Sequence, residues 1–343
     1  QITTTGTPGA LIYNVFGNHY YTQPGNYPIA LLVTKPPVAV PPPAVAQPLP
    51  GARTVAATTV TILPAPLTTI SGRLNPFSDS GVSNSDGITN VVQPTYSGLV
   101  DSPGATVVVV ATSAATGVQT LLGATQADEA GAWSVTSGVA LPDGYYTMTL
   151  YSADRYNSSN VITKVLDQVL LIDTFAPRVI AAAFIPRSGI VQLVYQDYGG
   201  HGVGSGMVLS TLQDPSNYTF SFVSTTVRGY RPPSQWLVGP VGVTPATTVG
   251  PQTTYVTING GAAMRGGVYQ LIARSRSAAL PSGIQDVAGN ALDGEFYGNY
   301  PSGNGVSGGD FTARLDSIHN RVFAPGTTVG PRTPTPPRRP VRR

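Results

Sequence analysis

The sequence predicts an all-β protein built from β-sandwiches arranged in tandem. Glycine (39 of 343 residues) and proline (32) are plentiful, and valine and threonine recur throughout, which is typical of short strands joined by turns. A strand-entry pattern also occurs three times, with Tyr two residues after Gly and apolar residues at every second position. No stretch of about 12 residues keeps a helical period without Gly or Pro, so we expect no long helices.

The three pattern tyrosines are Tyr27, Tyr146 and Tyr269, and each lies in phase with the buried side of its strand. A tyrosine just inside a late strand, with a buried ring and a hydroxyl that bonds backbone, is a device of immunoglobulin-like sandwiches. The sequence therefore predicts up to three sandwich units in a row.

Composition restricts the classes of protein that are compatible with this chain. Charged residues make up 10% of the chain, well below the usual quarter or so, and there is no cysteine. Disulfides and thiolate metal sites are excluded, and the Thr- and Ser-rich surface favours an exported bacterial protein. No apolar run approaches the ~18 residues of a membrane span. The sequence starts at Gln1 without a signal-peptide pattern, so we expect any export signal to have been removed or to lie upstream. Five arginines in the last 12 residues account for the net charge of +3, which leaves about −2 for the rest of the chain.

The two ends of the chain differ from its middle. Residues 1–34 predict two strands, at 10–16 and 27–33, and residues 35–66 predict a stiff Pro-rich linker whose positions 54–63 have strand character. Residues 324–343 predict a Pro/Arg-rich tail without a core. The first segment resembles the C-terminal half of a PKD-like domain, and the matching residues are His19, Tyr21, Pro24, Gly25 and Tyr27. The front half of that family is absent, so we expect a β hairpin or half-domain that is a piece of something larger or packs on something else.

Residues 67–172 predict the clearest sandwich. Turn signals separate seven expected strands, at 68–74, 95–100, 106–112, 120–127, 133–135, 145–152 and 161–172. The region resembles the bacterial Ig-like repeats of large surface adhesins. The resemblance rests on five ordered motifs, at residues 78–90, 103–107, 127–133, 141–147 and 173–177.

Residues 173–323 predict a second, more divergent Ig-like domain. Its expected strands are residues 179–184, 190–195, 218–223, 253–258, 268–274 and 311–315. Residues 212–218 and 284–294 resemble Ig-like domains of bacterial surface-layer and cell-surface proteins. The Pro/Gly-rich excursion at 228–254 predicts a loop or an extra hairpin.

Calcium is the best candidate cofactor, because hard cations need several oxygens that converge from loops. The main candidate ligands lie within ten residues of a Gly-containing loop and are Asp286, Asn290, Asp293 and Glu295. The alternative is a turn in which Asp and Asn cap their own backbone. Weaker candidate ligands are Asp79 and Asp86 in an earlier loop, and Asp173. The adhesin resemblance favours Asp173, because some of those repeats bind calcium at domain junctions, whereas a rigid Pro177-containing linker without metal is the alternative there.

Catalytic groups are scarce, so the sequence predicts a protein that is not an enzyme. The three histidines (His19, His201 and His319) lie far apart, and no nucleophile–base or paired-carboxylate arrangement can be assembled. Trp133 follows the repeat pattern and is expected in the core. Trp236 lies in the excursion and is the candidate aromatic platform for a carbohydrate.

Three functions fit these observations. The first is a non-enzymatic structural or adhesive module of an exported bacterial cell-surface protein. The second is a subunit of an extracellular fibre or surface layer that assembles by strand addition, and the third is a carbohydrate-binding accessory module. Expected partners are other copies or other surface proteins, with anionic glycans or the envelope as candidates for the Arg-rich tail. The tail lacks interleaved aromatics, so nucleic acid is not expected.

Overall fold

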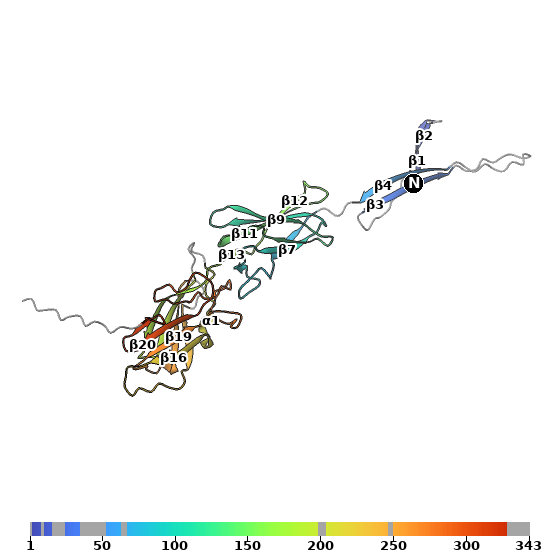
Figure 1. Cartoon of the computed structure of the whole chain (residues 1–343). Coiled ribbons are helices and arrows are strands. Elements are labelled where there is room, and N and C mark those ends of the chain that lie inside the picture. The colour runs from blue at the N-terminus through green and yellow to red at the C-terminus, as the bar shows by residue number, and fades with distance from the viewer. Residues whose placement is uncertain are drawn as a thin grey trace, which may run out of the picture.

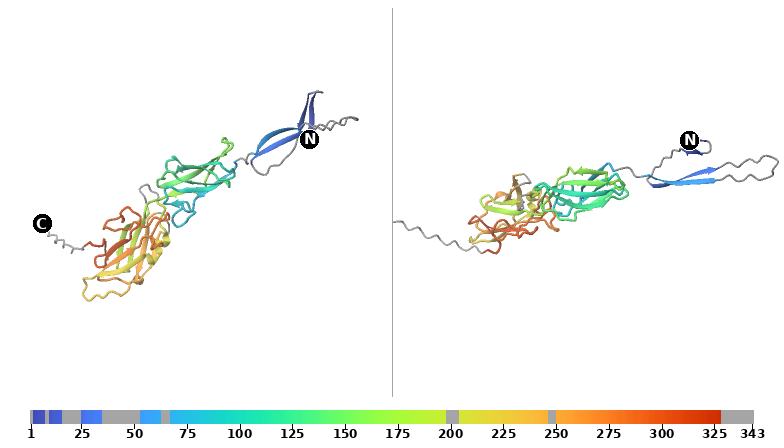
Figure 2. Two further views of the ribbon diagram at one scale, coloured as in Figure 1. Left: turned by 45° about the vertical axis from the view of Figure 1, so that its right-hand side comes forward. Right: turned by 90° about the horizontal axis from the view of Figure 1, so that it is seen from above.

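The computed structural model confirms the all-β prediction, because almost every regular element is a strand. Two sandwiches lie end to end, with the N-terminal strands beyond the first (Figures 1 and 2). The structure describes residues 2–7, 10–15, 25–34, 53–62, 67–197, 204–245 and 250–327.

The first sandwich has a three-stranded and a six-stranded sheet. The first sheet contains, in spatial order, β10 (Ala132–Thr136), β7 (Thr95–Val100) and β5 (Ile70–Leu74). The second contains β6 (Ile88–Thr89), β13 (Leu170–Ile172), β11 (Gly144–Ala153), β8 (Thr106–Ser113) and β9 (Gln119–Gln126), with β12 (Val161–Val165) also paired to β11. The single strand expected at 161–172 is thus two short strands, both of which pair with β11.

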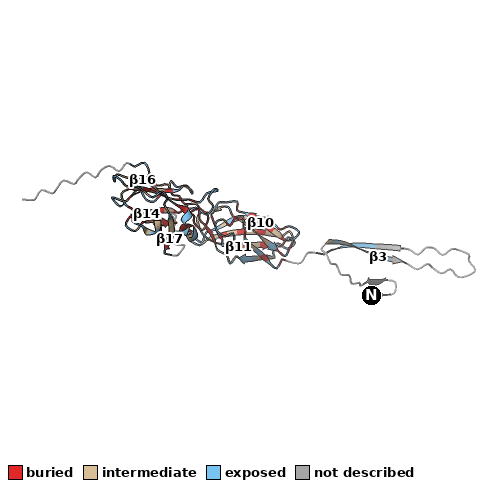
Figure 3. Ribbon diagram, turned by 90° about the horizontal axis from the view of Figure 1, so that it is seen from below, coloured by how far each residue is buried: buried red, intermediate tan, exposed pale blue. Residues whose placement is uncertain are grey.

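Alternation of buried and partly exposed residues along β8 and β11 builds the core of this sandwich. Val109 on β8 and Met148 on β11 are fully buried, and the buried positions form the red interior in Figure 3. Trp133 lies in this core, as the sequence predicted, and its indole N–H donates to the Ser71 carbonyl at 3.1 Å. Position 72 must be glycine, because an added Cβ would clash with the Trp133 ring.

The second sandwich has two four-stranded antiparallel sheets. One contains β14 (Arg178–Ile185), β15 (Ile190–Gln196), β18 (Gln252–Ile258) and β17 (Val238–Thr244). The other contains β16 (Tyr218–Ser224), β19 (Val268–Ala273), β20 (Phe311–Asp316) and β21 (Arg321–Phe323). Short helical turns are α1 (Leu209–Gln213), η1 (Pro215–Asn217) and η2 (Asn259–Gly261). The excursion at 228–254 contributes β17, which adds an edge strand to the first of these sheets.

Tyr146 and Tyr269 make the expected contact with backbone. The Tyr146 hydroxyl donates to the Pro142 carbonyl at 2.8 Å, and the Tyr269 hydroxyl donates to the Arg265 carbonyl at 3.0 Å. Both rings are buried, and both bonds join residues four positions apart. The tyrosine therefore fixes the turn through which the chain enters β11 or β19.

The N-terminal strands pair differently from the expected arrangement. β2 (Ala10–Val15) pairs with β1 (Ile2–Thr7), and β3 (Gly25–Thr34) pairs over its whole length with β4 (Arg53–Ile62). A hairpin between residues 10–16 and 27–33 is therefore not formed. Part of the expected linker is strand β4, because its Val- and Thr-rich residues supply a partner for β3. His19, Tyr21 and Pro24 of the PKD-like pattern, His201, and the tail from residue 328 lie outside the described residues.

The tyrosine contact is testable in the first sandwich. We expect Tyr146→Phe to lower the free energy of unfolding by about 1–2 kcal/mol, because the Pro142 carbonyl loses its donor. Urea denaturation measures the change. Tyr145→Phe is the matched control, since Tyr145 is exposed on the same strand and its substitution should leave stability unchanged. Equal stability of Tyr146→Phe and wild type would contradict the assigned role.

Candidate metal centre

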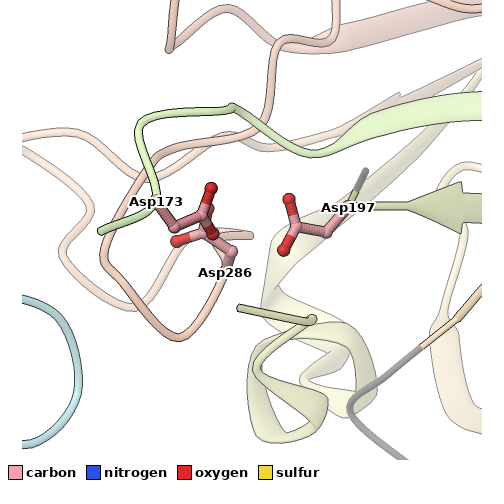
Figure 4. A group of neighbouring side chains, drawn as sticks. All are labelled: Asp173, Asp197 and Asp286. Carbon is pink, nitrogen blue, oxygen red and sulfur yellow. The ribbon is translucent and has the colours of Figure 1, made fainter. Parts of the chain in front are cut away.

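Three aspartates converge at the boundary between the two sandwiches. Asp173, Asp197 and Asp286 each offer a carboxylate oxygen, and these oxygens all lie within 4.8 Å of one another. Their carboxylates face each other from three separate segments (Figure 4). Asp173 and Asp286 are fully buried, and 7% of Asp197 is exposed. Such a concentration of like charge away from water is costly unless protons, amide donors or a cation compensate it.

The fold brings the three aspartates together through strand ends. Asp173 directly follows β13, at the start of the segment that connects the sandwiches, and Asp197 directly follows β15. β14 and β15 are antiparallel, so the start of β14 and the end of β15 lie side by side. Asp286 comes from a loop that is held to Met207 by a β-bridge.

Backbone amides fix the orientation of each carboxylate. The Ser205 N–H donates to Asp173 Oδ2 at 2.6 Å, and the Gly206 N–H donates to Asp197 Oδ2 at 2.6 Å. The Asn290 backbone N–H donates to Asp286 Oδ1 at 2.7 Å, and the Asn290 side-chain amide donates to Asp286 Oδ2 at 2.8 Å. The cluster is thus preorganised by its supporting groups.

One oxygen of the cluster has no hydrogen-bond partner. Asp197 Oδ1 is buried and accepts no hydrogen bond, whereas Asp197 Oδ2 is bound by Gly206 N–H. A buried unpartnered carboxylate oxygen is rare in folded proteins and needs an explanation. Since it lies in a cluster of three carboxylates, a bound cation explains it directly.

The pKa values of all three aspartates are raised. Burial is the main cause, and it raises the pKa of Asp197 to about 7 and that of Asp286 to about 9. These values include a smaller contribution from the neighbouring carboxylates, and burial also raises the pKa of Asp173. Without a cation, the cluster retains protons that an exposed carboxylate would release.

The geometry of the cluster fits a calcium ion. Calcium binds oxygen ligands at about 2.3–2.6 Å, so two oxygens on one ion are at most about 5 Å apart. The spacing of the three oxygens, within 4.8 Å, satisfies that limit. The donors are all hard oxygens, which suits calcium better than a transition metal.

The structure divides the four residues of the expected calcium loop. Asp286 belongs to the three-aspartate cluster, and Asn290 supports it by hydrogen bonds. Asp293 instead forms a 3.0 Å ion pair with Arg178 and accepts N–H bonds from Asn304 and Gly305.

Glu295 also lies outside the cluster. Its Oε1 accepts a bond from the Asn304 side-chain amide at 3.0 Å. Asp293 and Glu295 interact with each other, and neither belongs to the group formed by Asp173, Asp197 and Asp286. A local run of oxygen-bearing residues does not fix which way each side chain points.

Asp79 and Asp86 are placed in a separate loop of the first sandwich. Asp79 Oδ2 accepts the Gly87 N–H at 3.1 Å, and Asp86 Oδ1 caps the Ile88 N–H at 3.0 Å. Burial raises the pKa of Asp79 to about 6, with a smaller effect from Asp86. These bonds stay within the loop, as in turns that Asp side chains cap, whereas Asp79 Oδ1 is buried without a hydrogen-bond partner.

Trp236 packs against the core of the second sandwich. Its ring is half-buried against the second core, with ring centroids 5.3 Å from Phe220 and 5.2 Å from Tyr269. This placement gives Trp236 a role in core packing, and its expected role as a platform for sugars stays a prediction. The remaining described histidine, His319, bonds Asp316 within its own turn at 2.6 Å.

Comparison with known proteins supports the Ig-like assignment of the first sandwich. Residues 66–174 match a family model described as a bacterial Ig-like domain. The matched region ends immediately after Asp173, and thus includes one of the three clustered aspartates. A search of curated proteins found no match. In the described part of the chain, no helix has the length and apolar character needed to cross a membrane.

The raised pKa values predict how stability depends on pH in calcium-free protein. Between about pH 4 and the folded pKa values, the folded state holds protons that unfolded aspartates have released, so stability falls as pH rises. We expect urea denaturation in chelator to give a lower free energy of unfolding at pH 8 than at pH 5.

The pH range of this effect on stability also differs from the range in which a carboxylate with a lowered pKa acts. Burial raises the pKa of Asp101, but hydrogen bonds from Thr68 and Thr69 outweigh it and lower the pKa to about 2. The contribution of Asp101 to stability therefore changes with pH only below about pH 4. Saturating calcium should reduce the fall between pH 5 and pH 8, because the ion replaces the protons. A rise in stability over this interval in chelator would contradict the account.

Proposed function

We propose that this chain is a non-enzymatic structural or adhesive module of an exported bacterial cell-surface protein, in which calcium locks the junction of two Ig-like domains. The bacterial Ig-like match supports the class of protein, and the cysteine-free, charge-poor composition favours export. The observation that carries the calcium site is the unpartnered Asp197 Oδ1 within a buried cluster of three carboxylates.

A cation at this position would join segments that belong to different parts of the chain. Asp173 lies on the connection between the sandwiches, whereas Asp197 and Asp286 belong to the second. Asp143, on the turn before β11, holds the same connection by accepting bonds from the Thr174 backbone N–H and hydroxyl. The site therefore suits a module whose purpose is to hold neighbouring domains in a fixed relation and transmit force along the chain.

Substitution of Asp197 tests the calcium site. Calcium should raise the melting temperature of wild type by several degrees relative to chelator. Asp197→Asn should remove that difference, and its stability in chelator should equal or exceed that of wild type because one buried charge is gone. Differential scanning calorimetry measures both effects.

Asp293→Asn is the matched control for this experiment. It loses the ion pair with Arg178 and should melt lower both with and without calcium, but it should keep the calcium-dependent difference. The proposal fails if wild type shows no calcium-dependent shift, or if Asp197→Asn keeps the shift and Asp293→Asn loses it.

Assembly by strand addition is a second candidate function, and the ribbon formed by β3 and β4 favours it. The ribbon is ten residue pairs long, and Ile29, Leu31 and Leu32 on β3 are exposed. Arg53 is the only charged residue in the two strands, so the ribbon carries little of the charge that usually keeps edge strands from pairing with other chains.

Sedimentation velocity of the full chain tests this assembly. Wild type should associate as concentration rises, and Ile29→Lys should shift it towards monomer because a charge is placed on the ribbon. Asn26→Lys, at an exposed polar position of the same strand, should have a smaller effect. A wild type that stays monomeric over the whole range would rule out this candidate.

A further inference from the structure

Asn290 connects the three-aspartate cluster to the first sandwich. Its side-chain N–H groups donate to Asp286 Oδ2 at 2.8 Å and to the backbone carbonyl of Asp173 at 2.9 Å. Its side-chain oxygen accepts a bond from the Asn90 amide at 3.1 Å. Asn290 is 5% exposed, so this amide has one defined set of partners. One end of the Asn290 amide therefore contacts the cluster, and the other end contacts a loop of the first sandwich.

The loop that carries Asn90 makes further contacts with the segment that contains Asn290. Ser80 Oγ accepts the Asn90 backbone N–H at 2.9 Å and donates to the Ala288 carbonyl at 2.8 Å. The Val82 N–H donates to the Val287 carbonyl at 3.3 Å. Gly81 lies so close that an added Cβ would clash with the Val287 carbonyl oxygen. The docking loop, residues 80–90, thus holds the segment 286–290 that bears both Asp286 and Asn290.

Asp173 is positioned by the first sandwich. Its backbone N–H donates to the Thr89 carbonyl at 2.9 Å, next to the pairing of β13 with β6. Asp197 and Asp286 belong to the second sandwich, so the carboxylate of Asp173 joins them only while the two sandwiches are docked.

We infer that Asn90 is a positioning residue for the cation site, so that calcium binding and docking of the two sandwiches strengthen each other. This inference rests on the calcium site proposed above. When the docking loop leaves, Asn290 loses the partner of its side-chain oxygen and no longer holds Asp286 and Asp173 in place. By thermodynamic linkage, any factor by which docking tightens calcium binding is also the factor by which calcium tightens docking. The calcium concentration around the protein would then set the stiffness of the joint.

Calorimetric titration of the full chain with calcium tests the inference. Asn90 does not reach the carboxylates itself, so Asn90→Ala should weaken calcium binding roughly two- to ten-fold through loss of one hydrogen bond. Asn84→Ala, an exposed asparagine on the same loop, should bind calcium like wild type. Equal affinity of Asn90→Ala and wild type would overturn the coupling but leave the calcium site in place.

Hydrogen exchange of wild type gives an independent measurement that needs no variant. Calcium should slow amide exchange in the docking loop, residues 80–90, although none of those residues belongs to the three-aspartate cluster. Unchanged exchange in that loop, in protein shown by titration to bind calcium, would overturn the coupling. If wild type does not bind calcium, both the proposed site and this inference are wrong.

Discussion

Mutual repulsion among Asp173, Asp197 and Asp286 is the constraint on which the joint between the two sandwiches depends. The three side chains are buried, and their nearest oxygens lie within 4.8 Å of one another. Backbone amides relieve part of the repulsion, but Asp197 Oδ1 receives no donor. The cluster must therefore take up protons or a cation. Either solution places a titratable or metal-dependent element at the boundary between domains.

The contacts around the cluster are arranged so that the joint and the site form together. The connecting segment begins at Asp173 and leads into β14. Asp143 of the first sandwich holds this segment by accepting hydrogen bonds from the backbone N–H and the hydroxyl of Thr174. The docking loop reaches from the first sandwich to residues 286–290 of the second. Because these hydrogen bonds join short loops, small displacements of one sandwich would break several of them. Such a joint is suited to a rigid module in which neighbouring domains keep one orientation.

The sequence predicted the fold well because its signals are local. Period-two alternation located most strands of both sandwiches within one or two residues, and the Gly-x-Tyr pattern identified the contacts of Tyr146 and Tyr269. The candidate site was found in part, since Asp173 and Asp286 were both expected as ligands. Asp197 was missed because it is separated by 89 positions from Asp286, and the pairing of β14 with β15 brings it into place. The signal that could have located Asp197 is its position: a carboxylate directly after a strand that pairs with the strand following Asp173.

A crystal structure of the chain grown in calcium would test the central claim most directly. Anomalous scattering should show one calcium ion bound by carboxylate oxygens of Asp173, Asp197 and Asp286 at about 2.3–2.6 Å. The docking loop should lie against residues 286–290 in the same crystal, as it does here. A cluster occupied by water or held by protons in saturating calcium, with the sandwiches docked as in this structure, would contradict the account.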